Sequence, residues 1–600
     1  MVNKNFRFNN TMTFNERINV FGSYILNLKI KYFLLIIVLV QFILHIPIFN
    51  LPPMGQHVWR QVMGLSMANN YYQEDLNFLE SAQDIRIGED DRGLVYTEFP
   101  LIYWLIGKSY HATGFSHING RLTAFLFSIL LIFSSYNLVK LFKYDEVFCR
   151  WFVFFLSFTP FFFYYSISLL PNLPSLSLFI TGIVLIYPKI KENKWGFRYF
   201  MGVALITLAT ITKQLYLFYG LVLAQIYLSS YFEIRKWQVL ISGFFSAIFI
   251  LFINYILWIY GLEINTNAPI ERSSTVQLDV GRLPFDFERY LSITQTAFTT
   301  WFLEMFVNTA AIPIFFYGLF LSIKYKKWES NNSGFWITWL ISFAILYFTY
   351  IDKFEQHGYY FTSISVLCAL CSTYGMIHLM KHKIGQKIGI FLLVMMLIVM
   401  IGRVSHRWID NKQVPDQLLY SSHDIQTHIP AQDKIIVHGD STPLVYLYFL
   451  NRKGLSLDMN NISENQLINY QNKGIKEGYL KSKDKWKIDD FFWSHRMLGR
   501  HADNLFWMAR YLERTENSAR CIQSAFLHTL TQRPDGDEEW AAILSSTGKS
   551  EAFAKCHVSV SMANVIDYLL RDKANEDSVI SLLANARQNA RSVRTALTQE

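Results

Sequence analysis

The chain has 600 residues, of which 52% are hydrophobic, 17% aromatic and only 17% charged. Soluble domains carry about 25% charged residues, so this composition excludes an ordinary set of soluble domains, and it also excludes a disordered or collagen-like chain. The net charge is +9, but the basic residues are scattered over short loops and gather on no single face, which excludes a nucleic-acid-binding protein. A polytopic membrane protein remains.

Apolar runs of about spanning length recur along the first two thirds of the chain. We count eleven, at about 32–50, 120–142, 151–169, 174–189, 198–212, 214–232, 237–260, 301–323, 335–350, 359–380 and 386–402. The expected fold is therefore a polytopic α-helical membrane protein of about 11 spans. Cys368 and Cys371 form a CxxC inside one of these runs, and we interpret them as small packing residues.

Lys and Arg residues indicate the side on which each loop lies. They are concentrated in the tail 1–30 and then in alternate loops, near 140–150, 189–198, 235–236, 324–327 and 381–387. Because positively charged loops stay in the cytoplasm, we expect the N-terminus there. The segments 51–119 and 261–300, and all residues after 403, are then expected outside the membrane.

The chain becomes aqueous in character after Arg403. The stretch "DKIIVHGD" predicts a short buried strand and a turn, and "ISENQLINYQNKG" predicts a helix that ends at Gly474. We interpret 404–490 as a small external α/β domain. From 497 onwards Arg replaces Lys, Ala becomes frequent, and apolar residues lie on helical stripes, which predicts an all-α segment over 497–600.

Catalytic or substrate-binding residues are expected in the outer segment 51–119, because the predicted spans hold almost no charged residues. A transporter would bury ionisable groups at mid-membrane depth, whereas polar groups here are concentrated outside. The acidic residues of this segment are Glu74, Asp75, Glu80, Asp84, Glu89, Asp90, Asp91 and Glu98. An acidic, aromatic-rich loop over a lipid-facing bundle favours a membrane enzyme that acts on a lipid-linked substrate, although such a loop is also typical of a merely solvated surface.

Several short motifs resemble a known family. "LPPMGQHVWRQ", "TEFPLIYWLIG", "INGRLTAFLFSILLIF", "YYSISLLPNLPSLSLFI", "ITKQLYL" and "EQHGYYFTSISVLCAL" occur in the order, and on the faces, typical of GT-C-type glycosyltransferases. The similarity covers about residues 30–490 and is strongest to the protein-mannosyltransferase and aminoarabinose-transferase-like group, with its RgtA/B/C/D-like relatives. The resemblance implies a hexosyl- or pentosyltransferase of the bacterial inner membrane. It would move a sugar from a polyprenyl-phosphate donor to a glycan, lipid or protein acceptor on the periplasmic side.

The resemblance implies a carboxylate base in the first outer loop, but the sequence departs from the family there. The acidic pair expected after the first span is replaced by Gly55-Gln56-His57, and the expected Pro-Asp is Pro171-Asn172. Glu98 is the acidic residue best placed by a matching motif, and His57 is the alternative. Asp90 and Asp91 are further acidic candidates.

Cations are needed to stabilise a departing lipid phosphate. We expect a set of five residues to bind the donor phosphate or the substrate. The alternatives for these residues are simpler roles as membrane anchor, snorkelling side chain or aromatic belt, and the alternative for Glu98 is a helix cap. The set is Arg60, Arg121, Lys213, His357 and Tyr360. A divalent metal is compatible with the acidic loop, but no ligand spacing requires one.

The C-terminal part resembles a second family. "MLGRHADNLFWMARYLERTENSAR", "DEEWAAIL", "VIDYLLRD" and "SVISLLANARQNARSVRTALTQE" are similar, in order, to the N-terminal third of bacterial alpha-E domain proteins, over 497–600. We expect a chimeric join near 491–497 rather than one evolved enzyme. We also expect such a partial helical array to leave apolar faces uncovered.

Two other functions fit the same outline. An O-antigen polymerase or ligase-like enzyme also combines many spans with large outer loops, and 261–300 offers Arg272, Arg282 and Arg289 but no His. A non-enzymatic transporter or flippase is disfavoured by the charge-poor spans.

Overall fold

A computed structural model describes residues 28–87, 91–269, 287–324, 332–410, short pieces between 412 and 457, 485–531 and 537–592. The chain divides into two compact units. The first ends near residue 463, and the second holds helix α21 (Lys485–Thr531) and the helices after it.

Seven helical stretches in the described ranges are long and apolar enough to cross a membrane, and all lie in the first unit. The protein is a polytopic α-helical membrane protein. The stretches are α2 (Ile30–Phe49), α5 (His117–Leu141), α8 (Asn172–Glu192), η1 (Gln214–Tyr219) with α10 (Gly220–Ile234), α11 (Trp237–Thr266), η5 (Gly358–Ile364) with α16 (Ser365–Leu379), and α17 (Lys383–Ser405) with η6 (His406–Asp410).

Three further apolar stretches are bent or are too short to count as single spanning helices. The helices over Phe287–Phe306 and Thr309–Lys324 form a pair bent by 90°. Asn308 lies at the bend with φ +66°, where its side-chain amide donates to the Met396 carbonyl at 2.9 Å. The bent pair consists of α12 (Phe287–Thr296), η2 (Ala297–Phe306), η3 (Thr309–Ala311) and α13 (Ile312–Lys324). The other two stretches are the shorter apolar helices α9 (Phe197–Thr212) and α14 (Ser333–Thr349). The short helix α15 (Ile351–Gln356) follows α14.

The apolar run at 151–169 is not one span. It is divided into α6 (Glu146–Ser157) and α7 (Pro160–Tyr165), and the predicted count of eleven is therefore not reached as single helices. The first helix ends at Ser157, and Thr159 caps the second, because its hydroxyl accepts from the Phe162 N–H at 3.1 Å and Pro160 occupies the first helical position. Both helices are largely buried in protein, and an apolar run of this kind cannot be told from a lipid-facing one by hydropathy alone.

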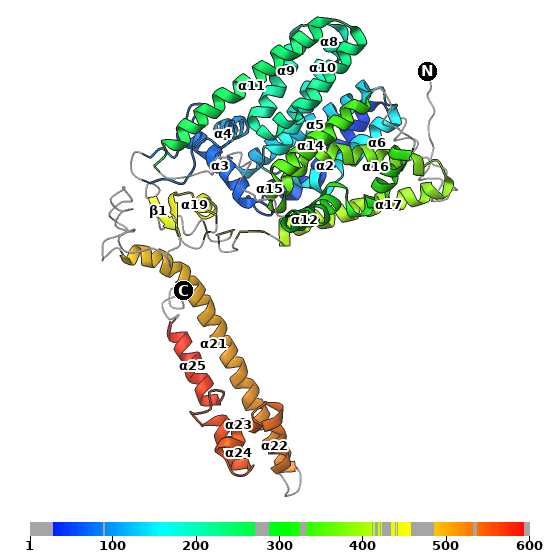
Figure 1. Ribbon diagram of the computed structural model, residues 1–600. Helices are drawn as coiled ribbons and strands as arrows, with labels where there is room; N and C mark the ends of the chain where they lie inside the picture. The colour runs from blue at the N-terminus through cyan, green and yellow to red at the C-terminus, as the bar shows by residue number, and fades with distance from the viewer. Residues whose placement is uncertain are drawn as a thin grey trace, which may run out of the picture. The chain divides into compact units, whose positions relative to one another are not determined.

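Burial separates the lipid-facing helices from the interior ones. In the most apolar window of the stretch that ends in α16, 89% of residues are buried, but only 22% are buried in α11. Phe244 and Phe245 of α11 expose 63% and 64% of their surface, which is the surface that lipid would cover. Helices α8, α9, α10 and α11 lie side by side at one edge of the first unit (Figure 1).

The segment 51–119 folds against one end of this bundle and carries α3 (Val58–Gln73) and α4 (Leu101–Thr113). Its acidic residues do not simply face solvent, since Asp84, Asp91 and Glu98 expose only 5%, 9% and 7% of their surface. The interpretation of this segment as a merely solvated acidic loop is therefore wrong for these three.

A small α/β piece, which lies within the expected 404–490 domain, packs on the same segment. It consists of β1 (Lys434–Val437), α19 (Val445–Leu450) and β2 (Lys453–Ser456), and its two strands are parallel, with Lys434 opposite Lys453. Gly454 has φ +153°, and a Cβ there would collide with the backbone of Ile435, so only glycine fits. The rest of 404–490, and the boundaries of the domain, stay predictions.

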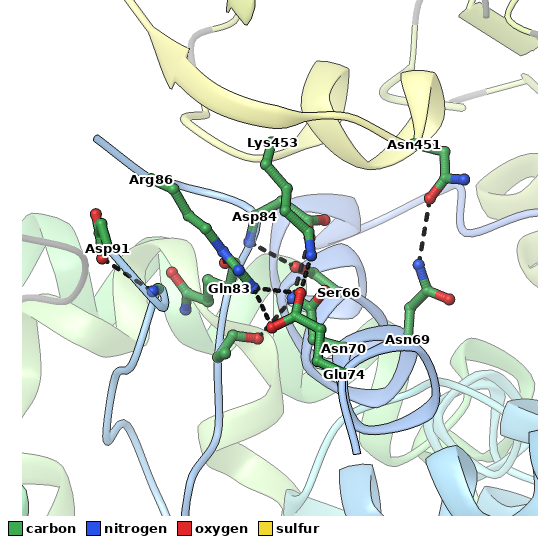
Figure 2. Close-up of polar contacts among 12 residues, drawn as sticks. Ser66, Asn69, Asn70, Glu74, Gln83, Asp84, Arg86, Asp91, Asn451 and Lys453 are labelled. Atoms are coloured by element: carbon green, nitrogen blue, oxygen red, sulfur yellow. Dashed lines mark hydrogen bonds and ion pairs between the residues drawn. The ribbon is translucent and has the colours of Figure 1, made fainter. Parts of the chain in front are cut away.

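Ion pairs and backbone contacts attach this piece to the segment 51–119 (Figure 2). Gly454 forms a parallel bridge with Ile85. Glu74 accepts two hydrogen bonds from the Arg86 guanidinium, at 2.8 and 3.0 Å, and also pairs with Lys453. Residues 51–119 and 434–457 thus lie at the same end of the bundle, and the side of the membrane that this end faces stays a prediction.

The second unit is all-helical, as expected. After α21 come α22 (Asp537–Ser546), α23 (Ser550–Cys556), α24 (Met562–Leu570) and α25 (Val579–Ser592), with Trp540 fully buried in a small core. Apolar side chains on α21 stay exposed, among them Phe506 at 57% and Leu530 at 68%. The expected join at 491–497 lies within α21, and its position stays a prediction.

Candidate active site

Glu98 lies where the segment 51–119 meets the helical bundle. It directly precedes Phe99, whose N–H donates to the Ile211 carbonyl at the end of α9, at 3.3 Å. Pro100 then starts α4. This short stretch is therefore tied to α9 on one side and to a helix start on the other, which holds the carboxylate in a fixed position.

Three groups from three different elements converge on the Glu98 carboxylate. Arg60, in the first turn of α3, lies with its guanidinium 2.5 Å from Glu98 Oε1. The Tyr103 hydroxyl, in the first turn of α4, donates to the same oxygen. Lys213, the residue at which α9 ends, places its Nζ 3.6 Å from Oε2.

This environment keeps Glu98 ionised. Burial by itself would raise the pKa of the carboxyl, but the charges of Arg60 and Lys213 outweigh it and hold the pKa below the ordinary value of 4.5. A carboxylate with a lowered pKa is a weak base, so in this arrangement Glu98 chiefly orients the two cations.

A cavity of about 340 Å³ opens beside this group. Among the described residues that line it are three cations (Arg60, Lys213 and Lys353) and one carboxylate (Glu98), so its net charge is positive. Trp258 and Leu262 of α11 line another wall, and the turn Thr442–Leu444 before α19 a third. A positive cavity with one apolar wall at the edge of a bundle suits an amphiphile with an anionic head.

Aromatic rings form the remaining wall. His357, Tyr359 and Tyr360 stack in series, with centroids 5.3 Å apart between the first two and 5.1 Å between the last two. The Lys213 Nζ lies 5.9 Å from the centroids of both tyrosines. Asn172 supports this wall from behind, because its amide donates to the Tyr359 carbonyl at 3.2 Å.

His57 lies behind that wall and is not among the residues that line the cavity. It has φ +60° and is 5% exposed, and its ring centroid is 4.8 Å from that of Tyr359. Burial, followed by the charges of His357 and Arg407, lowers its pKa to about 3, so the ring is neutral at ordinary pH and a poor base. A catalytic role for His57 stays a prediction, and its position gives that role less support than it gives Glu98.

Arg121 also lies apart from the cavity. Its guanidinium donates to the carbonyls of Leu51 and Pro52 at 2.9 to 3.2 Å and lies 4.4 Å from the ring centroid of Trp408. These contacts fix the chain just after α2. The predicted phosphate contact of Arg121 stays a prediction, and the observed partners favour a structural role.

The two further acidic candidates differ in what can be said of them. Asp91 accepts from the N–H groups of Ile87 and Gly93, at 2.7 and 2.9 Å, and so shapes the turn around it. Asp90 lies outside the described residues. No group of three His, Cys, Asp or Glu within the described ranges is arranged to hold a metal ion.

Sequence reasoning missed two residues of this site. Tyr103 had a usable signal, since it follows Glu98 on the first turn of a helix that begins at Pro100. Lys353 had none, because nothing in its sequence surroundings indicates that α15 lines the same cavity as the segment 51–119.

Comparison with known proteins gives three results. Residues 497–600 match a family described as a predicted alpha-helical domain with a conserved ER motif, and this stretch contains the dipeptide Glu513-Arg514. A search of curated proteins gives no match to this chain. Solved structures give similar chains at low identity.

Two of those structures are of ArnT from Cupriavidus metallidurans. In the apo state it is 10% identical, with a TM-score of 0.47, over 71% of this chain and 86% of that one. Bound to undecaprenyl phosphate it is 9% identical, with a TM-score of 0.49, over 73% and 87%. The archaeal oligosaccharyltransferase AglB from Archaeoglobus fulgidus, in complex with an inhibitory peptide and a dolichol-phosphate, is 12% identical, with a TM-score of 0.43, over 71% and 64%.

Proposed function

We propose that this protein is a membrane glycosyltransferase that moves a sugar from a polyprenyl-phosphate donor to an acceptor at the outer face of the membrane. The observation that carries the proposal is the buried group of Arg60, Lys213 and Glu98 at the wall of a positive cavity. The sequence motifs of residues 30–490 support the same class of enzyme.

The cavity has the two surfaces that such a donor needs. Arg60 and Lys213 supply donors for the phosphate, and guanidinium groups bind phosphate oxygens in a forked geometry. Trp258, half exposed on α11, lies where an isoprenoid chain would pass from lipid to the head group. His357 and Tyr360 would then flank the sugar or the phosphate.

Donor binding would also raise the pKa of the Glu98 carboxyl. The Lys213 contact of 3.6 Å is the longer of the two ion pairs and is the one that an incoming phosphate would draw away first. With one cation removed, burial raises the pKa of the carboxyl, and Glu98 becomes a better base.

The transfer step then follows in one sequence. Glu98 takes the proton of the acceptor hydroxyl, and the hydroxyl oxygen forms a bond to the anomeric carbon. The bond between that carbon and the phosphate oxygen breaks, and its electron pair leaves with the lipid phosphate, which Arg60 and Lys213 stabilise.

The test combines binding with activity. The purified protein in lipid nanodiscs is titrated with a polyprenyl phosphate, and glycolipids of cells that express each variant are compared by mass spectrometry. Arg60→Met and Lys213→Met should each weaken binding at least tenfold, and Glu98→Gln should abolish the sugar-bearing product while the protein still inserts.

Arg92→Met is the matched control, because Arg92 lies in the same segment and its side chain is 54% exposed. It should change neither readout. Equal binding by Arg60→Met, Lys213→Met and the control, or an unchanged product with Glu98→Gln, would contradict the proposal.

A further inference from the structure

A second cavity, of about 450 Å³, lies on the other side of α3 from the first. Both cavities use residues of α3, the first also the turn Thr442–Leu444 just before α19, and the second α19 itself, which packs against α3. The candidate active site uses Arg60 near the start of α3, whereas the second cavity uses Asn69 and Tyr72 near its end. Asn69 lies nine positions after Arg60 in the helix, which is a distance on the order of 14 Å along the axis.

The chemistry of this cavity differs sharply from that of the first. No Asp, Glu, Lys or Arg is among the described residues that line it. Its polar groups are amides, hydroxyls and one imidazole, which both donate and accept hydrogen bonds. The lining includes Asn69, Tyr72, Gln73, Phe115, His117 and Tyr448.

One polar side chain in the lining of this cavity has an atom without a hydrogen-bond partner among the described residues. Asn69 is 6% exposed, and its amide nitrogen donates to Asn451 Oδ1 at 3.3 Å. Its side-chain oxygen is buried and accepts no hydrogen bond from the part of the chain that the structure describes. Leaving a buried acceptor unpaired is costly, so a ligand hydroxyl or amide that reached this oxygen, after a small rotation of the Asn69 side chain, would be stabilised there.

Aromatic side chains supply the apolar part. Phe115 is 47% exposed and Tyr72 is half-buried, so each ring keeps an open face. Tyr72 is held edge-on to His111 at 5.0 Å, and Phe115 lies 5.4 Å from His117. Rings held by neighbours in this way bind a flat apolar face with little loss of side-chain entropy.

We propose that this second cavity binds a neutral carbohydrate. A sugar combines many hydroxyl groups, which match the amides and hydroxyls, with a face of C–H bonds, which matches the rings of Tyr72 and Phe115. None of the described residues that line the cavity carries a charge, which disfavours phosphate, uronate and basic ligands. That the bound sugar belongs to the acceptor glycan of the first cavity rests on the proposed function.

The proposal is tested by saturation-transfer NMR on the full chain in phospholipid nanodiscs, without maltoside detergent. The probes are neutral hexoses and N-acetylhexosamines and their disaccharides, with glucuronate and glucose 6-phosphate as anionic counterparts. At least one neutral sugar should bind, and Asn69→Leu, Tyr72→Ala and Phe115→Ala should each weaken that binding by about fivefold or more.

Matched controls separate loss of the site from loss of the fold. Asn137→Ala and Tyr255→Ala change exposed residues of α5 and α11 outside both cavities and should bind as the parent does. Phe115→Ala changes a half-exposed side chain, so it keeps the test valid even if Asn69→Leu fails to fold.

The outcomes are distinguishable from those of the proposed function. Glu98→Gln should keep sugar binding while it loses transfer, and absence of any transferase activity would leave the binding result intact. Binding of anionic sugars only, binding of no sugar, or equal binding by the parent and the three cavity variants would overturn the carbohydrate site.

Discussion

Replacing Glu98 with Gln should destabilise the protein much more than an ordinary loss of surface charge does. The Glu98 and Arg60 side chains are 6% and 8% exposed, and their closest atoms are 2.5 Å apart. Removing one partner of a buried ion pair leaves the other charge unpaired, at a cost of about 3–5 kcal/mol. Gln keeps the size and one accepting oxygen, so we expect the lower end, about 3 kcal/mol.

A double-mutant cycle with Arg60→Met isolates the pair. Once Glu98 is neutral, removing the Arg60 charge relieves an unpaired cation, so the two costs should not add, and the coupling should be about 2 kcal/mol or more. The free energy of unfolding is measured by steric trapping in bicelles. Arg92 and Glu80, 3.1 Å apart but 54% and 24% exposed, form the control pair, for which we expect about 1 kcal/mol or less.

The pH dependence gives an independent check. Because the pKa of Glu98 is lower in the folded protein than its ordinary value of 4.5, its contribution to stability is complete above that value and is lost as the pH falls below it. The stability difference between parent and Glu98→Gln should therefore shrink below pH 4.5. Additive costs within about 0.5 kcal/mol, or a difference that does not change with pH, would refute the reasoning.

Three other residues give predictions that need only standard measurements. Burial raises the pKa of Asp84, so its charged form is disfavoured in the folded protein. Asp84→Asn should therefore gain stability relative to the parent as the pH rises from 4 to 7. A relative loss of stability over this range would contradict the prediction. Gly454→Ala should expose the 434–457 piece to proteolysis, because a side chain has no space against β1, whereas unchanged protease resistance would be contrary evidence. Trp540→Ala should lower the melting temperature of the C-terminal helices, by loss of a fully buried ring worth about 3–5 kcal/mol, without changing sugar transfer. A fourth test uses single cysteines at Asp75 and Asn451, both exposed, which an impermeant maleimide should label from the same side of sealed vesicles; opposite sides would be inconsistent with the Ile85–Gly454 bridge.

The sequence was sufficient for the class of fold because spanning helices need long apolar runs, and such runs are visible without neighbours. The sequence was insufficient for the number of membrane-spanning helices. The run at 151–169 is as apolar as a span, yet it is buried in protein and broken at Thr159-Pro160. The break had a local signal, a capping Thr before a Pro, that hydropathy ignores.

The candidate site was predictable where a motif fixed the residue and unpredictable where only packing did. Glu98, Arg60, Lys213, His357 and Tyr360 come together in one cavity, although they come from segments far apart in the sequence. Arg121 looked equivalent to Lys213, because both lie at the predicted outer ends of spans. The difference is that carbonyl groups of the chain after α2 surround Arg121, and no sequence pattern reports such a surrounding.

The two cavities depend on one attachment point. The turn Thr442–Leu444 before α19 closes the first cavity, and Tyr448 at the other end of α19 lines the second. Both are carried by a piece that the Ile85–Gly454 bridge and the Glu74–Lys453 ion pair hold against the segment 51–119. Weakening that attachment with Gly454→Ala should therefore reduce polyprenyl phosphate binding and sugar binding together, whereas Glu98→Gln should leave sugar binding unchanged. If Gly454→Ala affected one cavity alone, the shared α19 could not be what sets the geometry of both.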